Sequence, residues 1–431
     1  MKTNLWMAAA VAGAVCAAAQ GEDLTWRWGG DLRLRQEAFD DIPIKTEEPS
    51  VTRGGRNDYF RIRTRVKGGA DWGEKASLDV RLANEFRVRD CGPASYEWPD
   101  ELIVDQLKLT LRGLLDGAAD LTVGRQDVSL GSGRLFGEGT AKDGSRTQFF
   151  DGARLRVRAG EKRTLDVFGF RGRSENKLAV GHEHRDLTGL AGGRTGMHET
   201  SGGAFWEDRS IGGLGWGAYW VWLRDGSWTT SAGERVEHED IQTVGARLMP
   251  DFGGGVSAEA EGAWQFGTES GGRRAWFGAG SVKWTPGEGG AWVGLGGVAL
   301  SGDDPETDRR EDFNVLYGRY PWISELLLYA FDADGVGTWH NLALARLEAG
   351  GTWGAHRLKA SAGPVWAFER DGAGGGRTRG WLEGVQYEFP LAKGGWGALT
   401  GHLFAEVFEP GDYYVSDKTA YFARWQVNWE F

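Results

Sequence analysis

Length, composition and charge already exclude several classes of protein. The chain has 431 residues, among them 70 Gly, 22 Trp and only 2 Cys, and its formal net charge is −11. So much glycine, together with 12% aromatic residues, suits many strands and tight turns better than helices. Beyond the N-terminus no apolar stretch reaches the roughly 18 residues of a membrane helix, which excludes a helical membrane protein. The acidic balance disfavours a nucleic-acid partner.

Residues 1–19 have the composition of a signal peptide. One early positive charge precedes an apolar run, and the alanines at 17–19 form a small-residue cleavage site. We therefore expect cleavage near residues 19–21 and a mature domain over 22–431. An uncleaved anchor is the alternative, but the apolar run is short for a membrane span. The mature chain keeps one cysteine, Cys91, and so forms no intramolecular disulfide.

The rest of the chain shows one pattern throughout. Runs in which apolar and polar residues alternate are separated by breaks that contain Gly, Asp, Asn and Pro. Each run is long enough for the roughly 9–11 residues that a strand needs to cross a bilayer. The pattern predicts one all-β domain, a transmembrane antiparallel β-barrel of eighteen strands. The expected strands cover 24–39, 58–71, 74–89, 102–113, 118–126, 147–159, 162–172, 202–210, 213–225, 236–249, 255–268, 272–285, 290–301, 337–350, 354–369, 378–390, 395–408 and 418–431.

The lengths of the connections support this count. In outer-membrane barrels the periplasmic turns are short and the loops on the other side are longer. Brief connections follow even-numbered strands, at 71–74, 114–118, 159–162, 350–354 and 391–395. Long connections follow odd-numbered strands, at 40–57, 90–101, 127–146, 173–201, 302–336 and 409–417. This parity holds only if 202–210, the weakest of the eighteen patterns, is a strand.

The final strand, TAYFARWQVNWEF, shows how the barrel is expected to close. Alternation places Tyr421, Trp425 and Trp429 toward lipid and polar residues such as Arg424 toward the lumen. This strand must pair with 24–39, because an open edge in lipid leaves backbone groups without partners. A terminal aromatic on such a strand resembles the signal that the barrel-assembly machinery recognises, so we expect that machinery as a partner. A water-soluble β-sandwich or solenoid is the alternative fold, but it gives no reason for aromatic residues to gather at strand ends.

Cations alternate with apolar residues along the early strands. In YFRIRTRVKGG the side chains of Arg61, Arg63 and Arg65 share one face. An arginine near the bilayer midplane costs about 2–4 kcal/mol on the lipid face, so this row must line the lumen. The same argument turns further cations inward, namely Arg33, Arg35, Lys67, Arg81, Arg87, Lys108, Arg112, Arg154 and Arg156. Adjacent strands thus build a basic wall.

Later strands carry inward acids instead, including Glu259, Glu261, Glu388 and Glu406. The lumen is therefore predicted to be basic on one side and mixed to acidic on the other. As a function, this polarity suits a conduit for an extended anionic solute, with cations that bind firmly enough to admit it and loosely enough to release it. The structural alternative is that the arginines pair with inward Asp and Glu and stiffen the barrel.

Two segments resemble the alginate export family of outer-membrane barrels. In LTVGRQDVSLGSGRLFGEGTAKDGSRTQFFDGARLRV (121–157) a G-R-Q segment, a glycine-containing R-L loop and an F-D-G-x-R strand follow in the family's order. The stretch SGDDPETDRREDFNVLYGRYPWISELLLY (301–329) is similar to the family's long loop with its G-D, F and L-Y pattern. The resemblance implies an eighteen-stranded barrel and an arginine-rich constriction through which a polyuronate passes.

The resemblance also singles out individual residues. Those that match the motif are Gly124, Arg125, Gln126, Arg134, Asp151, Gly152 and Arg154. It makes Arg125 and Arg134 candidates for the constriction or for anchoring an inward loop over 127–146. Strict alternation would place Arg125 on the outer face, so an inward Arg125 requires a bulge or a position above the hydrocarbon rim.

Enzyme and metal functions find little support. The chain has no G-x-S-x-G, no H-E-x-x-H and no P-loop motif, so we predict no catalytic activity, although some outer-membrane barrels are hydrolases. His182 and His184, or Asp303 and Asp304, are the groups nearest to a metal-ligand pattern, but their spacing suits solvated loops better. We expect neither cofactor nor metal.

Together these observations predict an outer-membrane channel, surrounded by outer-membrane lipid, that passes an anionic polysaccharide or oligosaccharide or a related anionic solute through its basic lumen. The residues expected to contact the solute are the inward cations named above with Arg125 and Arg134. A general or small-anion porin remains the alternative within transport. A plugged barrel with a structural or surface-binding role is the alternative outside it.

Overall fold

The structure is a computed structural model of the whole chain. It describes residues 23–43, 55–91, 96–97, 99–137, 150–173, 198–225, 228–229, 235–236, 239–268, 271–287, 290–318, 323–330 and 340–431. The expected signal peptide at 1–19 lies outside these residues.

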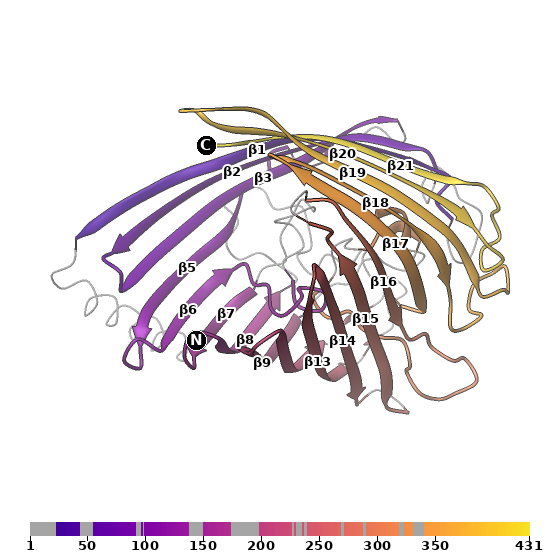
Figure 1. Cartoon of the computed structure of the whole chain (residues 1–431), viewed down its shortest axis with the longest axis horizontal. Helices are drawn as coiled ribbons and strands as arrows, with labels where there is room; N and C mark the ends of the chain where they lie inside the picture. Colours follow the sequence, from indigo (N-terminus) through magenta and orange to yellow (C-terminus); the bar gives the residue numbers. More distant parts are fainter. Residues whose placement is uncertain are drawn as a thin grey trace.

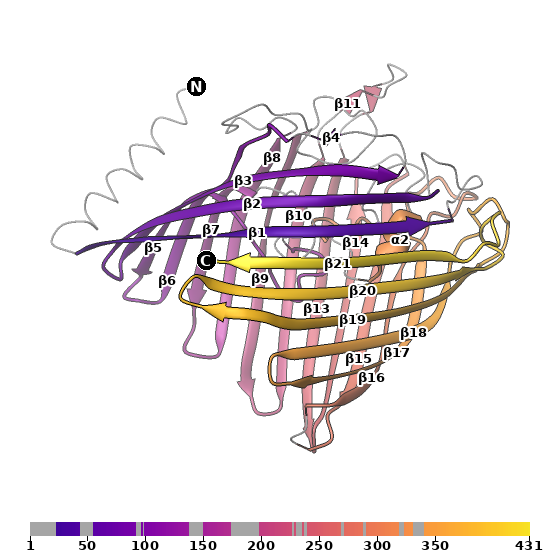
Figure 2. The same ribbon diagram turned by 90° about the horizontal axis from the view of Figure 1, so that it is seen from above.

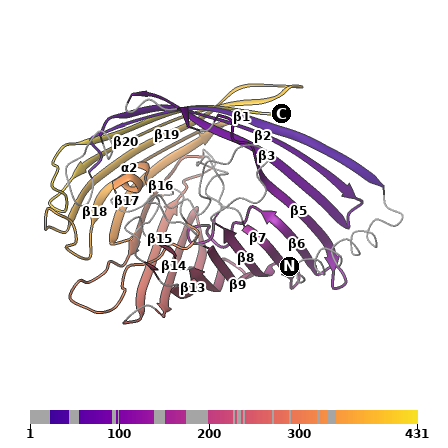
Figure 3. The same ribbon diagram turned by 180° about the vertical axis from the view of Figure 1, so that it is seen from behind.

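Eighteen long strands form one closed antiparallel barrel, in which each strand pairs with its neighbours in the sequence (Figures 1 and 3). They are β1 (Leu24–Asp40), β2 (Asn57–Trp72), β3 (Ala76–Cys91), β5 (Ile103–Leu114), β6 (Ala119–Gln126), β7 (Phe150–Arg158), β8 (Arg163–Arg173), β9 (His198–Ile211), β10 (Leu214–Asp225), β13 (Glu239–Gly253), β14 (Val256–Gly267), β15 (Arg273–Trp284), β16 (Trp292–Leu300), β17 (Leu342–Trp353), β18 (His356–Trp366), β19 (Thr378–Gly394), β20 (Gly397–Pro410) and β21 (Ala420–Glu430). Shorter elements are β4 (Tyr96–Glu97), β11 (Trp228–Thr229), β12 (Arg235–Val236) and the helix α2 (Glu325–Ala330).

The barrel closes where the last strand meets the first. Strand β21 pairs with β1 from Asp31 opposite Glu430 to Asp40 opposite Tyr421, and Figure 2 shows it lying beside β1. Beyond this ladder the backbones of Gly30 and Phe431 exchange two hydrogen bonds, of 3.0 and 3.1 Å. The predicted seam is confirmed, and the C-terminal aromatic is part of it.

All eighteen predicted strands are present, including the weakest pattern at 202–210, which forms the centre of β9. The short connections also lie where they were expected, for example between Trp72 and Ala76 and between Gly394 and Gly397. The helix α2 was not predicted. It lies within the long connection between β16 and β17, where six helical residues are too few to show a helical period in the sequence.

The apolar residues are distributed as a barrel in lipid requires. Large apolar side chains on the outer face are exposed, as with Leu347 (68%) and Tyr421 (55%). The tightly buried apolar residues lie instead inside the barrel, where Phe136, Leu326 and other residues of the long connections pack against inward side chains of the strands. Within the described residues no helix is long and apolar enough to cross a membrane.

Candidate functional site in the barrel lumen

Three adjacent strands, β21, β1 and β2, bring a row of arginines together on the inner face of the barrel. In the β1–β2 register Arg33 lies opposite Arg63, and Arg35 lies opposite Arg61. Like charges directly opposite each other destabilise a sheet unless something compensates them. Strand β21 adds Arg424 from the other side of β1, where it lies opposite Glu37.

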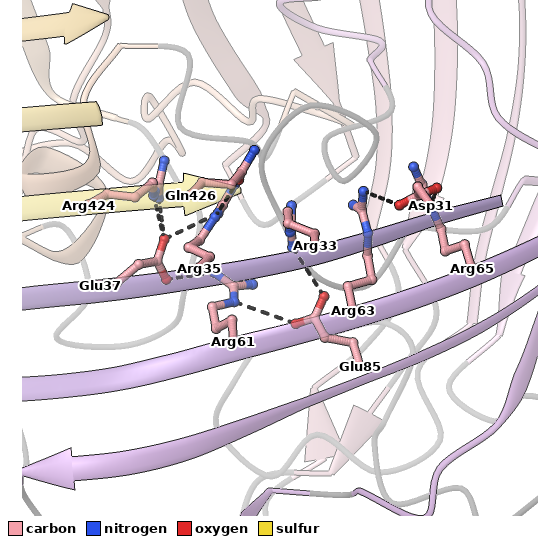
Figure 4. A network of polar contacts seen from close by, with 10 residues as sticks. All are labelled: Asp31, Arg33, Arg35, Glu37, Arg61, Arg63, Arg65, Glu85, Arg424 and Gln426. Atoms are coloured by element: carbon pink, nitrogen blue, oxygen red, sulfur yellow. Dashed lines mark hydrogen bonds and ion pairs between the residues drawn. The ribbon is translucent and has the colours of Figure 1, made fainter. Parts of the chain in front are cut away.

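Two carboxylates partly offset the charge of the row on the side nearest to the short turns (Figure 4). Asp31 accepts from Arg63 at 2.9 Å and from Arg65 at 2.7 Å. Glu85 of β3 pairs with Arg33 at 3.3 Å and with Arg61. Asp31 thus bridges two cations of β2, and Glu85 bridges one cation of β1 and one of β2.

Glu37 is the centre of the other part of the network. Its side chain is fully buried, and its carboxylate contacts Arg35 at 3.2 Å, Arg61 at 2.9 Å and Arg424 at 2.8 Å. Gln426 completes the surroundings by accepting two hydrogen bonds from Arg35, of 2.8 and 2.6 Å. Transferring a charge from water into the protein interior is costly unless the charge is paired, which explains why these arginines lie beside carboxylates.

The network nevertheless carries an excess of positive charge. Six arginines share three strand carboxylates, which leaves a formal charge of +3 on the wall. The arginines are Arg33, Arg35, Arg61, Arg63, Arg65 and Arg424, and the carboxylates are Asp31, Glu37 and Glu85. Glu325, which reaches Arg424 from the connection between β16 and β17, lowers the excess to +2. The pairing that sequence analysis kept as the structural alternative is therefore present, but it does not cancel the positive charge of this wall.

A cavity of about 830 Å³ opens beside the network, between β1–β2 and β17–β21. Its lining includes Ala355 in the short turn between β17 and β18, Pro390 near the end of β19 and Glu430 at the end of β21, so the cavity reaches the short-turn end of the barrel. The charged lining consists of seven cations and four carboxylates: Arg33, Arg63, Arg65, Arg346, Arg357, Lys359 and Arg424, with Glu325, Glu388, Glu406 and Glu430. Of the cations, Arg357 and Lys359 have the most accessible side chains, at 72% and 41%.

Three of these cations, Arg346, Arg357 and Lys359, were not predicted from the sequence to line the lumen. In β17 the exposed, outward Leu347 stands between Arg346 and Glu348, which therefore point inward. In β18 the exposed Leu358 stands between Arg357 and Lys359 in the same way. The signal was thus present in the alternation. The early strands are richer in arginine, and the predicted basic wall was confined to them.

The connection after β6 enters the lumen. Arg134 contacts Glu259 and, at 3.1 Å, Glu261, both on the distant strand β14. Burial alone would lower the pKa of Arg134, but these two carboxylates outweigh it and raise the pKa, so the guanidinium stays charged. These contacts link the connection to a strand on another part of the wall. Whether Arg134 acts at the constriction or as an anchor of the inward loop stays a prediction.

Aromatic packing holds the same segment in place. The ring of Phe136 lies 5.0 Å from that of Phe150, 4.7 Å from that of Phe168 and 4.8 Å from that of Tyr317. Tyr317 belongs to the connection between β16 and β17, so two long connections meet inside the barrel. The lumen is therefore narrowed by packed chain.

The G-R-Q and F-D-G motifs lie on adjacent, paired strands. Across β6 and β7, Gly124 lies opposite Gly152, Arg125 opposite Asp151 and Gln126 opposite Phe150. The G-R-Q and F-D-G triplets therefore meet residue by residue.

The register corrects the expectation that Arg125 lines the lumen. Arg125 also lies opposite Leu107, an exposed apolar residue of the outer face, and no register shift occurs at this point. Its guanidinium pairs with Asp151 through two hydrogen bonds, of 2.7 and 2.8 Å, and donates a third to the carbonyl of Val104. Strict alternation was right, and the outward charge is tolerated because a carboxylate beside it satisfies it.

The remaining predicted cations lie on the inner face in varied surroundings. Arg81 pairs with Asp105 at 2.8 Å, and both Arg154 and Arg156 pair with Asp166. Arg112 donates to Ser77, and the guanidinium of Arg87 lies 5.0 Å from the centre of the Tyr59 ring. For Lys67 and Lys108 the described part of the chain offers no ion pair.

The metal candidates have other roles or cannot be placed. Asp303 accepts from the backbone of Glu311 at 2.7 Å, and Asp304 from that of Glu306 at 2.9 Å, so both stabilise turns. His182 and His184 lie outside the described residues. Among the residues that the structure does describe, no cluster of three or more His, Cys, Asp or Glu has the arrangement of a metal site.

Comparison with known proteins bears on this architecture. The sequence profile of the alginate export family matches residues 26–370. Three similar solved structures, all from Pseudomonas aeruginosa, each align with 94% of this chain and 98% of their own: OccK2 (OpdF) in complex with glucuronate (13% identity, TM-score 0.58), OpdL (14%, 0.58) and OccK5 (OpdH) (12%, 0.54). At such identities they show the fold, that of the Occ and Opd porins. Curated protein sequences give no match.

Proposed function

Because this chain belongs to the alginate export family and is a barrel of the outer membrane, we propose that it is a channel for an anionic saccharide. The substrate would be an alginate-like polyuronate or a related anionic solute. The observation that carries the proposal is the charge of the lumenal cavity, in which seven cations face four carboxylates. The family and the similar structures are channels rather than enzymes.

The chemistry of the cations suits passage better than tight binding. A uronate residue carries one carboxylate, which guanidinium groups bind through paired hydrogen bonds. Arginines such as Arg63 and Arg65 already share Asp31, so an incoming carboxylate gains only part of their interaction. Sites that are favourable but weak allow a solute to enter and to leave.

A small-anion porin is the second candidate, and one observation favours it. The connections at 127–137 and 302–318 and the segment 323–330 pack inside the barrel and narrow the lumen. Such a lumen suits a single extended chain or small anions better than a bulky solute. A barrel that is plugged altogether, with a structural role, would pass no current.

Reversal potentials in planar bilayers under a salt gradient test the proposal. We expect anion selectivity that weakens in the double variant Arg357→Gln/Lys359→Gln, because these are the most accessible cations of the cavity. The matched control is Arg224→Gln/Arg274→Gln. In β10 alternation places Arg224 on the same outer face as Trp220 and Trp222. Arg274 lies opposite the exposed Phe266, so neither arginine lines the lumen. Equal selectivity in all three proteins would refute the assignment of the cavity.

A further inference from the structure

A short segment, residues 323–330, lines the cavity through Ile323 and Glu325. It includes the helix α2, which is labelled in Figure 3. The backbone of Ile323 is held by Arg346, whose guanidinium donates to its carbonyl at 3.2 Å. Leu326 and Leu327 are fully buried against the inner side chains of the barrel. The helix contacts β20 and β21, the two strands that supply Glu406 and Arg424 to the same cavity.

Glu406 holds the start of the helix. Its carboxylate accepts from the hydroxyl of Ser324 at 2.8 Å and from the backbone N–H groups of Glu325 and Leu326 at 2.9 and 3.0 Å. A helix of six residues does not persist alone, so its geometry depends on these contacts and on the buried leucines. These contacts and the buried leucines fix the backbone of Glu325, whose side chain reaches Arg424.

Glu325 places a carboxylate against Arg424. Both side chains are almost completely buried, at 5% and 2% exposure, and both line the cavity. Arg424 is also bound by Glu37, so its guanidinium serves one carboxylate from the strands and one from the inward segment. The second of these belongs to a short connection segment rather than to the barrel wall.

We propose that Glu325 is an internal stand-in for a substrate carboxylate at an anion site formed by Arg424 and Arg346. A uronate entering the cavity displaces Glu325 from Arg424 and releases the 323–330 segment from the lining of the cavity. This inference rests on the proposed function and names the place where the anionic solute binds. Glu325 thereby occupies the carboxylate site of the cavity until a uronate takes its place.

The exchange avoids an electrostatic penalty because Arg424 keeps the same number of carboxylate partners. Breaking one side of a buried pair is costly when the remaining charge has no new partner. Replacing one carboxylate by another preserves the partner of Arg424, while the cavity cations Arg33 and Arg63 help to attract the newcomer. A neutral sugar offers no carboxylate, so it leaves the segment in place.

Block of the ion current by trigalacturonate, added at the short-turn side of the barrel, tests the inference. In Glu325→Gln the anion site has lost its internal competitor, so we expect trigalacturonate to block at about tenfold lower concentration than in the wild type. The matched control is Glu430→Gln, which removes a carboxylate from the same cavity that does not contact Arg424. We expect its block to stay within about twofold of the wild type. Maltotriose, a neutral trisaccharide, should block all three proteins equally weakly.

A second variant covers the case in which Glu325→Gln does not fold. Glu325→Asp keeps the charge but shortens the side chain, so it should tighten the block by a smaller factor. Equal block in wild type, Glu325→Gln and Glu430→Gln would overturn the inference while leaving the proposed function intact. A wild-type channel that conducts chloride but is not blocked by trigalacturonate would overturn both.

Discussion

Gly124 lies directly opposite Gly152 in the β6–β7 pair, and at both positions a backbone carbonyl occupies the place of a side chain. A Cβ on Gly124 would lie 2.2 Å from the carbonyl oxygen of Leu107, and one on Gly152 would lie 2.0 Å from that of Gly169. Gly124 also has a φ of +115°, which residues with a side chain rarely adopt. The glycines of the family motifs are thus explained by the close approach of four neighbouring strands, β5 to β8.

Substituting Gly152 should destabilise the barrel. In Gly152→Ala the carbonyl of Gly169 cannot yield without moving the strand, and we expect a loss of about 1–3 kcal/mol of unfolding free energy. Gly169→Ala is the matched control, since a Cβ there meets nothing within 4 Å, and it should change stability by less than about 0.5 kcal/mol. Urea unfolding of the refolded protein in detergent measures both. Equal stability of the two variants would contradict the explanation.

The outward pair of Arg125 and Asp151 should affect stability without affecting selectivity. The Arg125 side chain is 3% exposed, so Asp151→Asn leaves a buried guanidinium with a weaker partner and should cost about 3–5 kcal/mol. Because the pair lies on the outer face, the reversal potential of Asp151→Asn and of Arg125→Gln should equal that of the wild type. A shift in selectivity would mean that Arg125 does reach the lumen.

Loosening the inward segment at 127–137 should widen the channel. In Arg134→Gln the contacts with Glu259 and Glu261 are weakened, so we expect a larger and noisier single-channel current. Arg247→Gln is the control, because Arg247 also pairs with Glu259, at 2.9 Å, but belongs to the wall strand β13. An unchanged current in Arg134→Gln would show that this segment does not limit conduction.

Local alternation explains why so much of the barrel was predictable. A period of two fixes which side chains face lipid, and lipid tolerates few charges, so Arg61, Arg63 and Arg424 could be oriented from their neighbours alone. The same rule oriented Arg125 correctly outward. The expectation that it turns inward came from the family resemblance and was wrong.

Contacts inside the lumen could not be predicted in this way. Arg134 and Glu259 are 125 residues apart, and Arg424 and Glu325 are 99 apart, so no local pattern links them. Which carboxylate neutralises which arginine depends on the register of several strands at once. Glu37 illustrates this, since its three arginine partners come from β1, β2 and β21.

Solute uptake into proteoliposomes tests the central claim most directly. D-glucuronate and D-glucose have nearly the same size and differ in one carboxylate, so their entry rates through the reconstituted barrel isolate the effect of charge. A lumenal cavity with seven cations and four carboxylates predicts faster entry of glucuronate, and a smaller advantage in Arg357→Gln/Lys359→Gln. Equal rates for the two sugars, or faster entry of glucose, would contradict the assignment of this barrel as an anionic saccharide channel.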